Sequence, residues 1–146
     1  MKSVNKKTRI QPACANCLEI EKIVNKIYKY YSSSNKRQND LRKFCILNLY
    51  QKFRLVKIFE VRWVRSHYQA LLVILRNYPA LTGHLHYMKN LPNTSEFDQN
   101  TIDRAKELHF WLSSKHFLVT ILTQLDIQLY FSIFSEEFQL KGDLQF

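Results

Sequence analysis

The stretch Lys115–Leu140, KHFLVTILTQLDIQLYFSIFSEEFQL, has the strongest helical pattern in the chain. Apolar side chains recur along it every three or four residues, the spacing of one face of an α-helix. Extra aromatic side chains widen this face beyond what a single partner helix would cover. The helix is therefore either central in a bundle or partly a surface for another chain. The inward positions are predicted to be Leu118, Ile121, Leu122, Leu125, Leu129 and Ile133, with Phe134 beside them.

Five residues of this helix are candidate contacts for a partner chain. They are the four aromatic side chains that widen its apolar face and one leucine of its main apolar repeat, and together they predict an interaction face. This face consists of Phe117, Leu125, Tyr130, Phe131 and Phe138.

The composition favours one helical domain. A chain of 146 residues, 46% of them hydrophobic, has room for one core. Only two glycines and three prolines are present, a scarcity that favours long helices over turn-rich β architecture. We therefore expect a mainly α fold, a bundle of about five helices.

Four further helices are predicted from the same spacing. The first has apolar positions at Ile20, Ile23, Val24, Ile27, Tyr30 and Tyr31, and the run Ser32–Asn35 is expected to end it and to cap the next. Pro79 is expected to end or kink the third, and residues 82–100 are expected to be a loop with a helical turn before Met88. The first of these helices begins at Leu18, and the other three cover Gln38–Phe53, Ser66–Tyr78 and Thr101–Ser113. The second helix is expected to bury Leu41, Phe44, Cys45, Leu47 and Leu49 or their neighbours.

At most one short strand is expected, at residues 55–61, where β-branched and aromatic side chains gather. A strand of this length needs a partner. The resulting division is a basic, disordered lead-in at 1–16, a helical domain at 17–141 and a tail at 142–146.

The sequence gives no sign of secretion or of a membrane span. The N-terminal segment is basic and has no apolar core of the kind found in signal peptides. The most apolar run, His116–Ser135, is interrupted by Gln124, Asp126 and Gln128, so it falls short of an uninterrupted span. We expect a soluble intracellular protein with neither a membrane nor a small-molecule substrate as partner.

Cys14 and Cys17 have the spacing of a zinc knuckle or a redox pair. A zinc site needs four ligands, and no second pair with suitable spacing follows. The alternative is that these are incidental thiols. The prediction is therefore no metal and no cofactor.

The net charge of +10 is concentrated in the first half of the chain. Residues 1–76 have 17 Lys and Arg against 4 Asp and Glu, a net of 17 − 4 = +13; residues 77–146 have 5 against 8, a net of −3. Such a basic half attracts polyanions by phosphate contacts and counterion release. The alternative is that these side chains form solvated helix faces.

An Arg-Trp pair, Arg62 and Trp63, stands within FEVRWVRSHYQALLVILRNYPAL at residues 59–81. Together with two other segments, it resembles the hAT superfamily of transposases and the host proteins derived from them. The resemblance runs over about residues 18–140 and implies a helical insertion of a ribonuclease H-like core. The other two segments are KIYKYYSSSNKRQNDL (Lys26–Leu41) and AKELHFWLSSKHFLVTILTQLDIQLYFSIFSEEFQ (Ala105–Gln139).

The chain departs from the family pattern in informative places. Asn16 stands where the family often has a His, and Val61 where it usually has a Thr. The resemblance places the three catalytic carboxylates upstream and downstream of this region, so none is expected here. Two-metal phosphoryl transfer needs those carboxylates at one site. The chain's own acids are better explained as surface or helix-end residues, so we expect no enzyme and no catalytic residue.

The resemblance implies a place for the Arg-Trp pair beside a DNA end. Trp63 would stack on an unpaired base, and Arg62 and Arg65 would hold phosphates. The alternative is that Trp63 fills the strand-to-helix corner of the core. Ser66 is expected to cap the following helix.

The sequence thus predicts a non-catalytic remnant of a hAT-like transposase, a nucleic-acid-associated or protein-interaction module. The alternative is a helical dimerisation module with no nucleic-acid role. The expected partners are DNA and a second copy or another hAT-like protein. The expected location is the nucleus, with the cytoplasm as alternative.

Overall fold

The computed structural model describes residues 12–51, 54–58, 63–92 and 96–143. These residues form six helices and no strand, which confirms the expected mainly α bundle. The helices are α1 (Pro12–Ser32), α2 (Asn35–Leu47), α3 (Trp63–Arg76), α4 (Tyr78–Lys89), α5 (Gln99–Leu112) and α6 (Lys115–Asp143).

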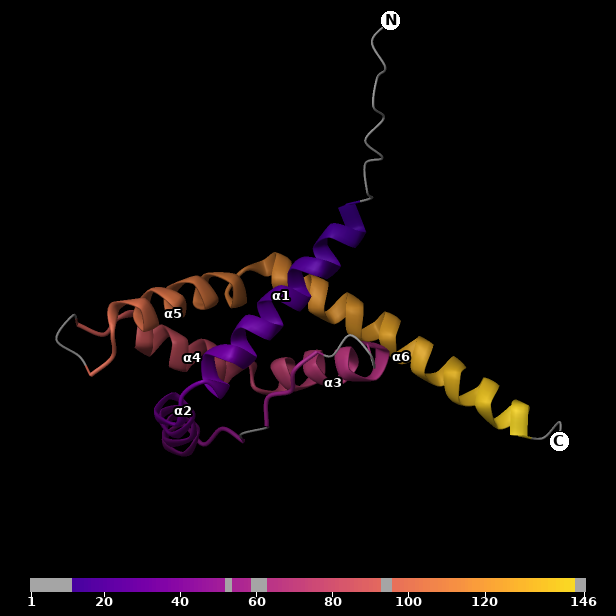
Figure 1. Cartoon of the computed structure of the whole chain (residues 1–146), viewed down its shortest axis with the longest axis horizontal. Coiled ribbons are helices and arrows are strands. Elements are labelled where there is room, and N and C mark those ends of the chain that lie inside the picture. Colours follow the sequence, from indigo (N-terminus) through magenta and orange to yellow (C-terminus); the bar gives the residue numbers. More distant parts are fainter. Residues whose placement is uncertain (1–11, 52–53, 59–62, 93–95, 144–146) are drawn as a thin grey trace, which may run out of the picture.

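Helix α1 is the element on which the others assemble. Helices α4 and α5 pack side by side as one pair, and α3 packs along α6 as another. Helix α1 contacts α5 of the first pair, both members of the second, and α2. Helices α1–α5 and the first half of α6 form the body of the bundle. Figure 1 shows α6 extending beyond this body, so that its C-terminal part projects with no other helix beside it.

The apolar face of α1 lies in the core as its spacing predicts. Its six predicted positions are all buried and lie in one cluster with side chains of α2 to α6. The buried Tyr30 and Tyr31 rings pack edge to face with their centroids 5.1 Å apart. The helix begins at Pro12, so residues 12–16, which were predicted to belong to the lead-in, form its first turns. Residues 1–11 lie outside the described part.

Polar side chains separate the helices where the sequence indicates. The Ser34 hydroxyl caps α2 by accepting a hydrogen bond from the backbone N–H of Arg37. Asp98 caps α5 through the N–H of Thr101. The Ser114 hydroxyl accepts from the N–H of Phe117 at 3.1 Å and marks the start of α6. Each oxygen satisfies a backbone donor that the first helical turn leaves unpaired.

The prediction of a loop at residues 82–100 is wrong for its first part, because α4 extends to Lys89. Pro79 stands in the first turn of α4, where its missing N–H costs no intrahelical hydrogen bond. Gly83 permits close packing of α4 on α2, since a Cβ atom there would lie 2.7 Å from Cζ of Phe44. The helix is favoured because it buries Ala80, Leu81, His84, Leu85 and Met88.

The predicted strand does not form within residues 54–58, which have no regular structure. Ile58 is buried, and its N–H donates to Oδ1 of Asn25 in α1 at 3.1 Å. The Asn25 side chain of α1 thus accepts the hydrogen bond that the backbone of a neighbouring strand would otherwise accept from Ile58. The rest of the predicted strand, residues 59–61, lies outside the described residues.

Helix α2 ends six residues before the predicted Phe53. Its carbonyls at Cys45 and Ile46 accept from the N–H groups of Tyr50 and Leu49, at 2.8 and 3.3 Å. This pattern is a Schellman motif, in which the residue after the C-cap adopts a left-handed conformation. Leu49 holds that position with a φ of 57°. The prediction that Leu47 and Leu49 are buried is wrong, since they are 81% and 94% exposed.

Replacing Leu49 with Gly is expected to stabilise the fold by about 1 kcal/mol, because a left-handed backbone costs a side chain that amount and glycine almost nothing. The Leu49 side chain is almost fully exposed, so its removal forfeits little packing. Leu47→Gly is the matched control, and it should destabilise by a similar amount because Leu47 is helical. Urea unfolding measures both. Equal destabilisation by the two substitutions would contradict the assignment.

Acid is expected to weaken the fold through His84. This ring is buried, and its Nδ1 lies 2.9 Å from the Tyr31 hydroxyl. Burial lowers the pKa of His84 from 6.5 to about 4, against a smaller opposing effect of Asp40. The unfolded chain therefore binds more protons between these two values, and stability falls as the pH drops through that window, by roughly 3 kcal/mol in all.

The variant His84→Asn tests this source of acid sensitivity, because an amide can occupy the place of Nδ1 but does not titrate. Urea unfolding from pH 8 to pH 4 should give a shallower loss of stability in the variant. An identical pH dependence in both proteins would exclude His84 as the cause.

Candidate interaction surface on helix α6

The first half of α6 is held against the body by one face. This face is buried and consists of Phe117, Ile121, Gln124, Leu125 and Gln128. Helices α1 and α3 are the elements that pack on α6 most extensively. The five residues fall within about 100° around the helix axis, as expected at 3.6 residues per turn.

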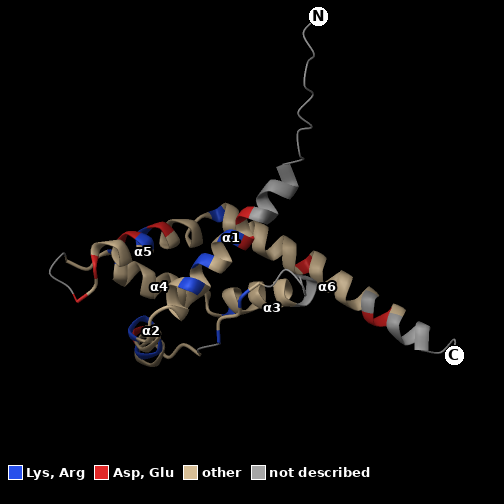
Figure 2. Cartoon of the chain, in the orientation of Figure 1, with Lys and Arg blue, Asp and Glu red and all other residues tan. Residues whose placement is uncertain are grey.

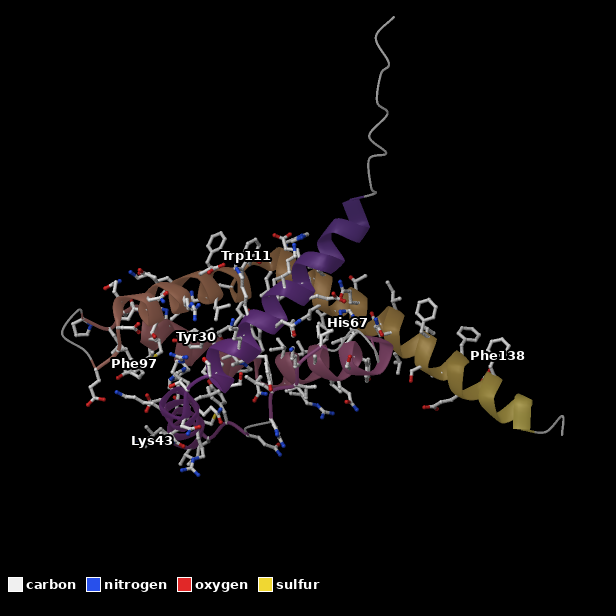
Figure 3. All side chains as sticks on the ribbon, in the orientation of Figure 1. Tyr30, Lys43, His67, Phe97, Trp111 and Phe138 are labelled. Atoms are coloured by element: carbon white, nitrogen blue, oxygen red, sulfur yellow. The ribbon has the colours of Figure 1, made fainter. Side chains whose placement is uncertain are left out.

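A buried histidine fastens the end of this face to α3. Nδ1 of His67 lies 2.9 Å from Nε2 of Gln128, and Nε2 of His67 lies 3.8 Å from the Glu21 carboxylate on α1. Burial lowers the pKa of His67 despite the opposing effect of Glu21, so the ring is neutral at pH 7. A neutral Nδ1 without a proton accepts from the Gln128 amide. Figure 3 labels His67 between α3 and the first half of α6.

Large apolar side chains continue along α6 beyond Gln128, where the buried face of the helix ends. Every large apolar side chain described beyond Gln128 is exposed, and Figure 3 shows Phe138 well away from the body. These residues are Leu129, Tyr130, Phe131, Ile133, Phe134 and Phe138.

Five exposed apolar residues align along one side of α6, and we call them the exposed stripe: Ile127, Tyr130, Phe131, Phe134 and Phe138. At 3.6 residues per turn they lie within about 100° of one another, and the centre of the stripe is about 100° from the centre of the buried face. Four of them follow the spacing 4-3-4, the seam of a coiled coil. The stripe therefore has the form of a helix-packing surface without a helix on it.

The exposed stripe is large for a lone protein. Its aromatic residues are 56–73% exposed and Ile127 is 49% exposed. At roughly 200 Å² per aromatic side chain, the stripe leaves about 600 Å² of apolar surface in water. That area is at the upper end of the largest apolar patch found on typical monomers, roughly 300–600 Å². Isolated helices are also marginal in water, so this part of α6 gains from a partner.

The structure divides the five predicted interaction residues between the exposed stripe and the core. Tyr130, Phe131 and Phe138 are exposed and belong to the stripe. Phe117 and Leu125 are core residues, since the body covers the first half of the helix. Conversely, the predicted inward positions Leu122, Leu129, Ile133 and Phe134 are 45–56% exposed.

Ile127 and Phe134 were missed as surface residues. The 4-3-4 spacing from Ile127 to Phe138 was available in the sequence as a signal. It was hidden because almost every turn of α6 has apolar residues on several sides, so the pattern indicates more than one face.

The predicted nucleic-acid residues cannot be placed on a surface. Arg62 lies outside the described residues. Trp63 and Arg65 are in the first turn of α3, and their side chains lie outside the described part. Ser66 is buried three residues after the start of α3, so the prediction that it caps this helix is wrong.

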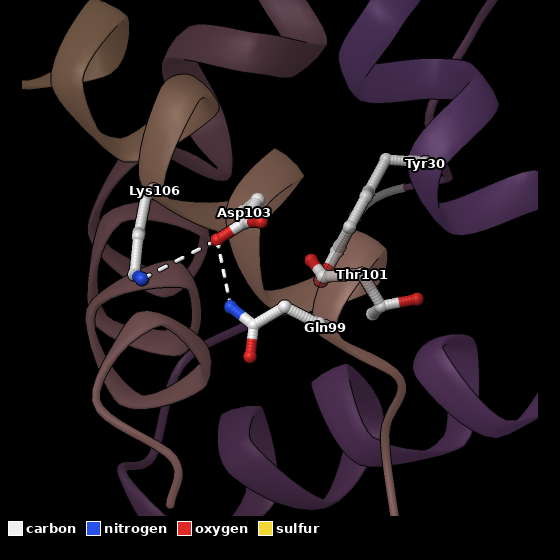
Figure 4. Close-up of polar contacts among 5 residues, drawn as sticks. All are labelled: Tyr30, Gln99, Thr101, Asp103 and Lys106. Atoms are coloured by element: carbon white, nitrogen blue, oxygen red, sulfur yellow. Dashed lines mark hydrogen bonds and ion pairs between the residues drawn. The ribbon is translucent and has the colours of Figure 1, made fainter. Parts of the chain in front are cut away.

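Acidic side chains of α5 and α6 either pair with neighbouring polar residues or lie exposed on a helix surface. Figure 4 shows the Asp103 carboxylate accepting from Nε2 of Gln99 at 2.8 Å, with Nζ of Lys106 at 3.3 Å. Asp126, Glu136 and Glu137 are exposed on α6. Among the residues whose side chains are described, no group of three His, Cys, Asp or Glu could hold a metal ion. Cys45 is buried, and the side chains of Cys14 and Cys17 are outside the described part.

The segment Lys115–Phe138 of α6 is long and apolar enough to cross a membrane by length and composition, with a mean hydropathy of 1.5 in its most apolar window. The expectation that no membrane is a partner stays a prediction. Core helices of soluble proteins pass the same criterion. The side of α6 that bears Phe117, Ile121 and Gln128 is covered by protein, so lipid could not surround this half of the helix in this fold.

No known protein-family profile matches the chain, and no solved structure matches its fold.

The division of α6 into a buried and an exposed part predicts opposite effects for two phenylalanines. Phe117→Ala should destabilise the fold by about 3–5 kcal/mol, because it leaves a cavity in the core. Phe138→Ala should change the free energy of unfolding by less than about 0.5 kcal/mol, because the ring is 73% exposed. Urea unfolding of dilute protein measures both. Comparable losses would mean that the projecting part packs on the body.

Proposed function

We propose that this chain is a non-catalytic protein-interaction module whose binding element is the projecting part of α6. The observation that carries the proposal is the exposed stripe, about 600 Å² of apolar surface on the outer side of α6. A helix that presents large side chains at such spacing is a recurrent means of protein recognition, either in a groove or against another helix.

The aromatic content of the stripe suits binding. Tyr130, Phe131, Phe134 and Phe138 supply most of its surface, and aromatic side chains bury a large area while fixing few torsions. Binding hot spots are enriched in such residues. Acidic side chains of α6 keep the surrounding surface soluble, since Asp126 and Glu137 lie beside the stripe.

We propose descent from a hAT-like transposase on the resemblance of residues 18–140. The structure supports this only in being helical, as an insertion region of that kind would be. The proposed absence of catalysis rests on the described residues, among which no three His, Cys, Asp or Glu gather to hold a metal ion. The nucleus is the proposed location, because a transposase-derived protein would act on chromosomal DNA or beside other such proteins.

Contact with DNA is the second candidate, and it is favoured by the basic surface of α1 and α2. Residues 19–51 and 54–58 contain nine Lys and Arg against three Asp and Glu. Figure 2 shows Lys and Arg positions in blue along α2. Arg42 and Lys43 of this helix are exposed. Among the described residues neither has an ion-pair partner. DNA binding of this kind weakens steeply with salt and would weaken further in Arg42→Ser plus Lys43→Ser.

The proposed function predicts that the stripe is an accessible apolar binding surface. An environment-sensitive anilinonaphthalene sulfonate dye, added to the chain at submicromolar concentration, should fluoresce on binding. Replacing Phe131 and Phe134 with Ser should remove most of that signal, because these rings lie at the centre of the stripe. Leu129→Ser plus Ile133→Ser is the matched control, since these side chains are similarly exposed on another side of α6.

Equal dye binding by the Phe131/Phe134 variant and the wild-type chain would contradict the proposal. The non-catalytic part has its own test, in which labelled duplex DNA is incubated with the chain and Mg²⁺ or Mn²⁺. The duplex should stay intact, and metal-dependent strand cleavage would overturn the assignment.

A further inference from the structure

We infer that the partner of the exposed stripe is a second copy of this chain, paired antiparallel along α6. This inference rests on the proposed function and adds the identity of the partner. It starts from the order of side chains along the stripe, which is nearly symmetric about a point between residues 132 and 133.

The symmetry follows from the positions of the four stripe residues that have the 4-3-4 spacing, which we call the seam: Ile127, Phe131, Phe134 and Phe138. In an antiparallel pair centred at that point, Ile127 faces Phe138 of the second copy, and Phe131 faces Phe134 of the second copy. The other two seam contacts repeat these by the two-fold axis, so that every seam residue meets an apolar partner. A two-fold interface requires such self-complementarity, because the same patch serves both subunits.

The flank of the seam supports the same pairing. Tyr130 and Glu137 occupy equivalent flanking positions, one heptad apart, and in an antiparallel coiled coil such positions lie opposite each other. The Tyr130 hydroxyl of each copy therefore comes beside the Glu137 carboxylate of the other and can donate to it.

The area also suits a second copy. Complete burial of two stripes would remove roughly 1,200 Å² from water, the lower limit for a specific interface. Figure 1 shows no other helix beside the projecting part of α6, so the stripe beyond Gln128 is open to a second helix. We therefore expect a reversible dimer with a dissociation constant in the micromolar range.

Sedimentation equilibrium of the full chain between about 1 and 100 µM tests the inference. The wild-type chain should pass from monomer to dimer, with little dependence on salt because the seam is apolar. Phe131→Ser plus Phe134→Ser should raise the dissociation constant at least about 100-fold, since both rings lie at the two-fold axis. Leu129→Ser plus Ile133→Ser should leave the constant within about threefold of wild type.

A charge exchange tests the orientation. Ile127→Lys and Phe138→Glu should each weaken the dimer alone, and an equimolar mixture should restore it as a heterodimer. A parallel pair would place residue 127 opposite residue 127, so the mixture would not recover. Circular dichroism of each variant confirms that its helices are intact.

The outcomes separate this inference from the proposed function. A chain that binds the dye through the stripe but stays monomeric to 100 µM overturns the second copy as partner and leaves the interaction module standing. A dimer that survives the Phe131/Phe134 substitutions overturns the stripe as its interface. Absence of both dye binding and dimerisation overturns both proposals.

Discussion

The packing of the first half of α6 on α1 and α3 is the constraint from which the functional reading follows. It determines which side of a helix with apolar residues all around is covered by the body. Once Phe117, Ile121 and Leu125 are buried, helical geometry places the centre of the exposed stripe about 100° from the centre of the covered side. The core and the exposed stripe are thus two consequences of the same contact.

The buried polar residues between α6 and α3 fix the rotation of α6 about its axis, and they lower the stability of the contact. The hydrogen bond between His67 and Gln128 fixes the rotation of α6 against α3, because only one rotation brings the amide to the ring. Gln124 is buried in the same contact, and both atoms of its amide have no hydrogen-bond partner among the described residues. An unsatisfied buried amide costs on the order of 1–3 kcal/mol. A purely apolar contact would be stronger but would permit α6 to rotate, which would move the stripe.

The sequence predicted the helices well where one face alone was apolar. Helix α1 has charged residues between its apolar positions, so its spacing identified the buried face residue by residue. Residues 82–89 were assigned to a loop because the segment 82–100 is polar and contains Gly83, Pro92, Asn93 and Ser95. The close approach of Phe44 and the burial of His84 depend on tertiary contacts. The strand at 55–61 was suggested by composition alone. The backbone N–H of Ile58 donates to the Asn25 side chain of α1 and not to a second strand, and a local sequence pattern does not predict such a tertiary contact.

The site was only partly predictable for a related reason. Helix α6 has apolar residues on every side, so the sequence alone could indicate that a surface was left over but not which one. Phe117 and Phe138 have the same chemistry and both lie on the wide apolar face, yet one is in the core and the other is in water. The difference is set by where the body ends along α6, a tertiary property. The 4-3-4 spacing becomes informative only when the covered face is known, because it then identifies an exposed side of α6 on which another helix can pack.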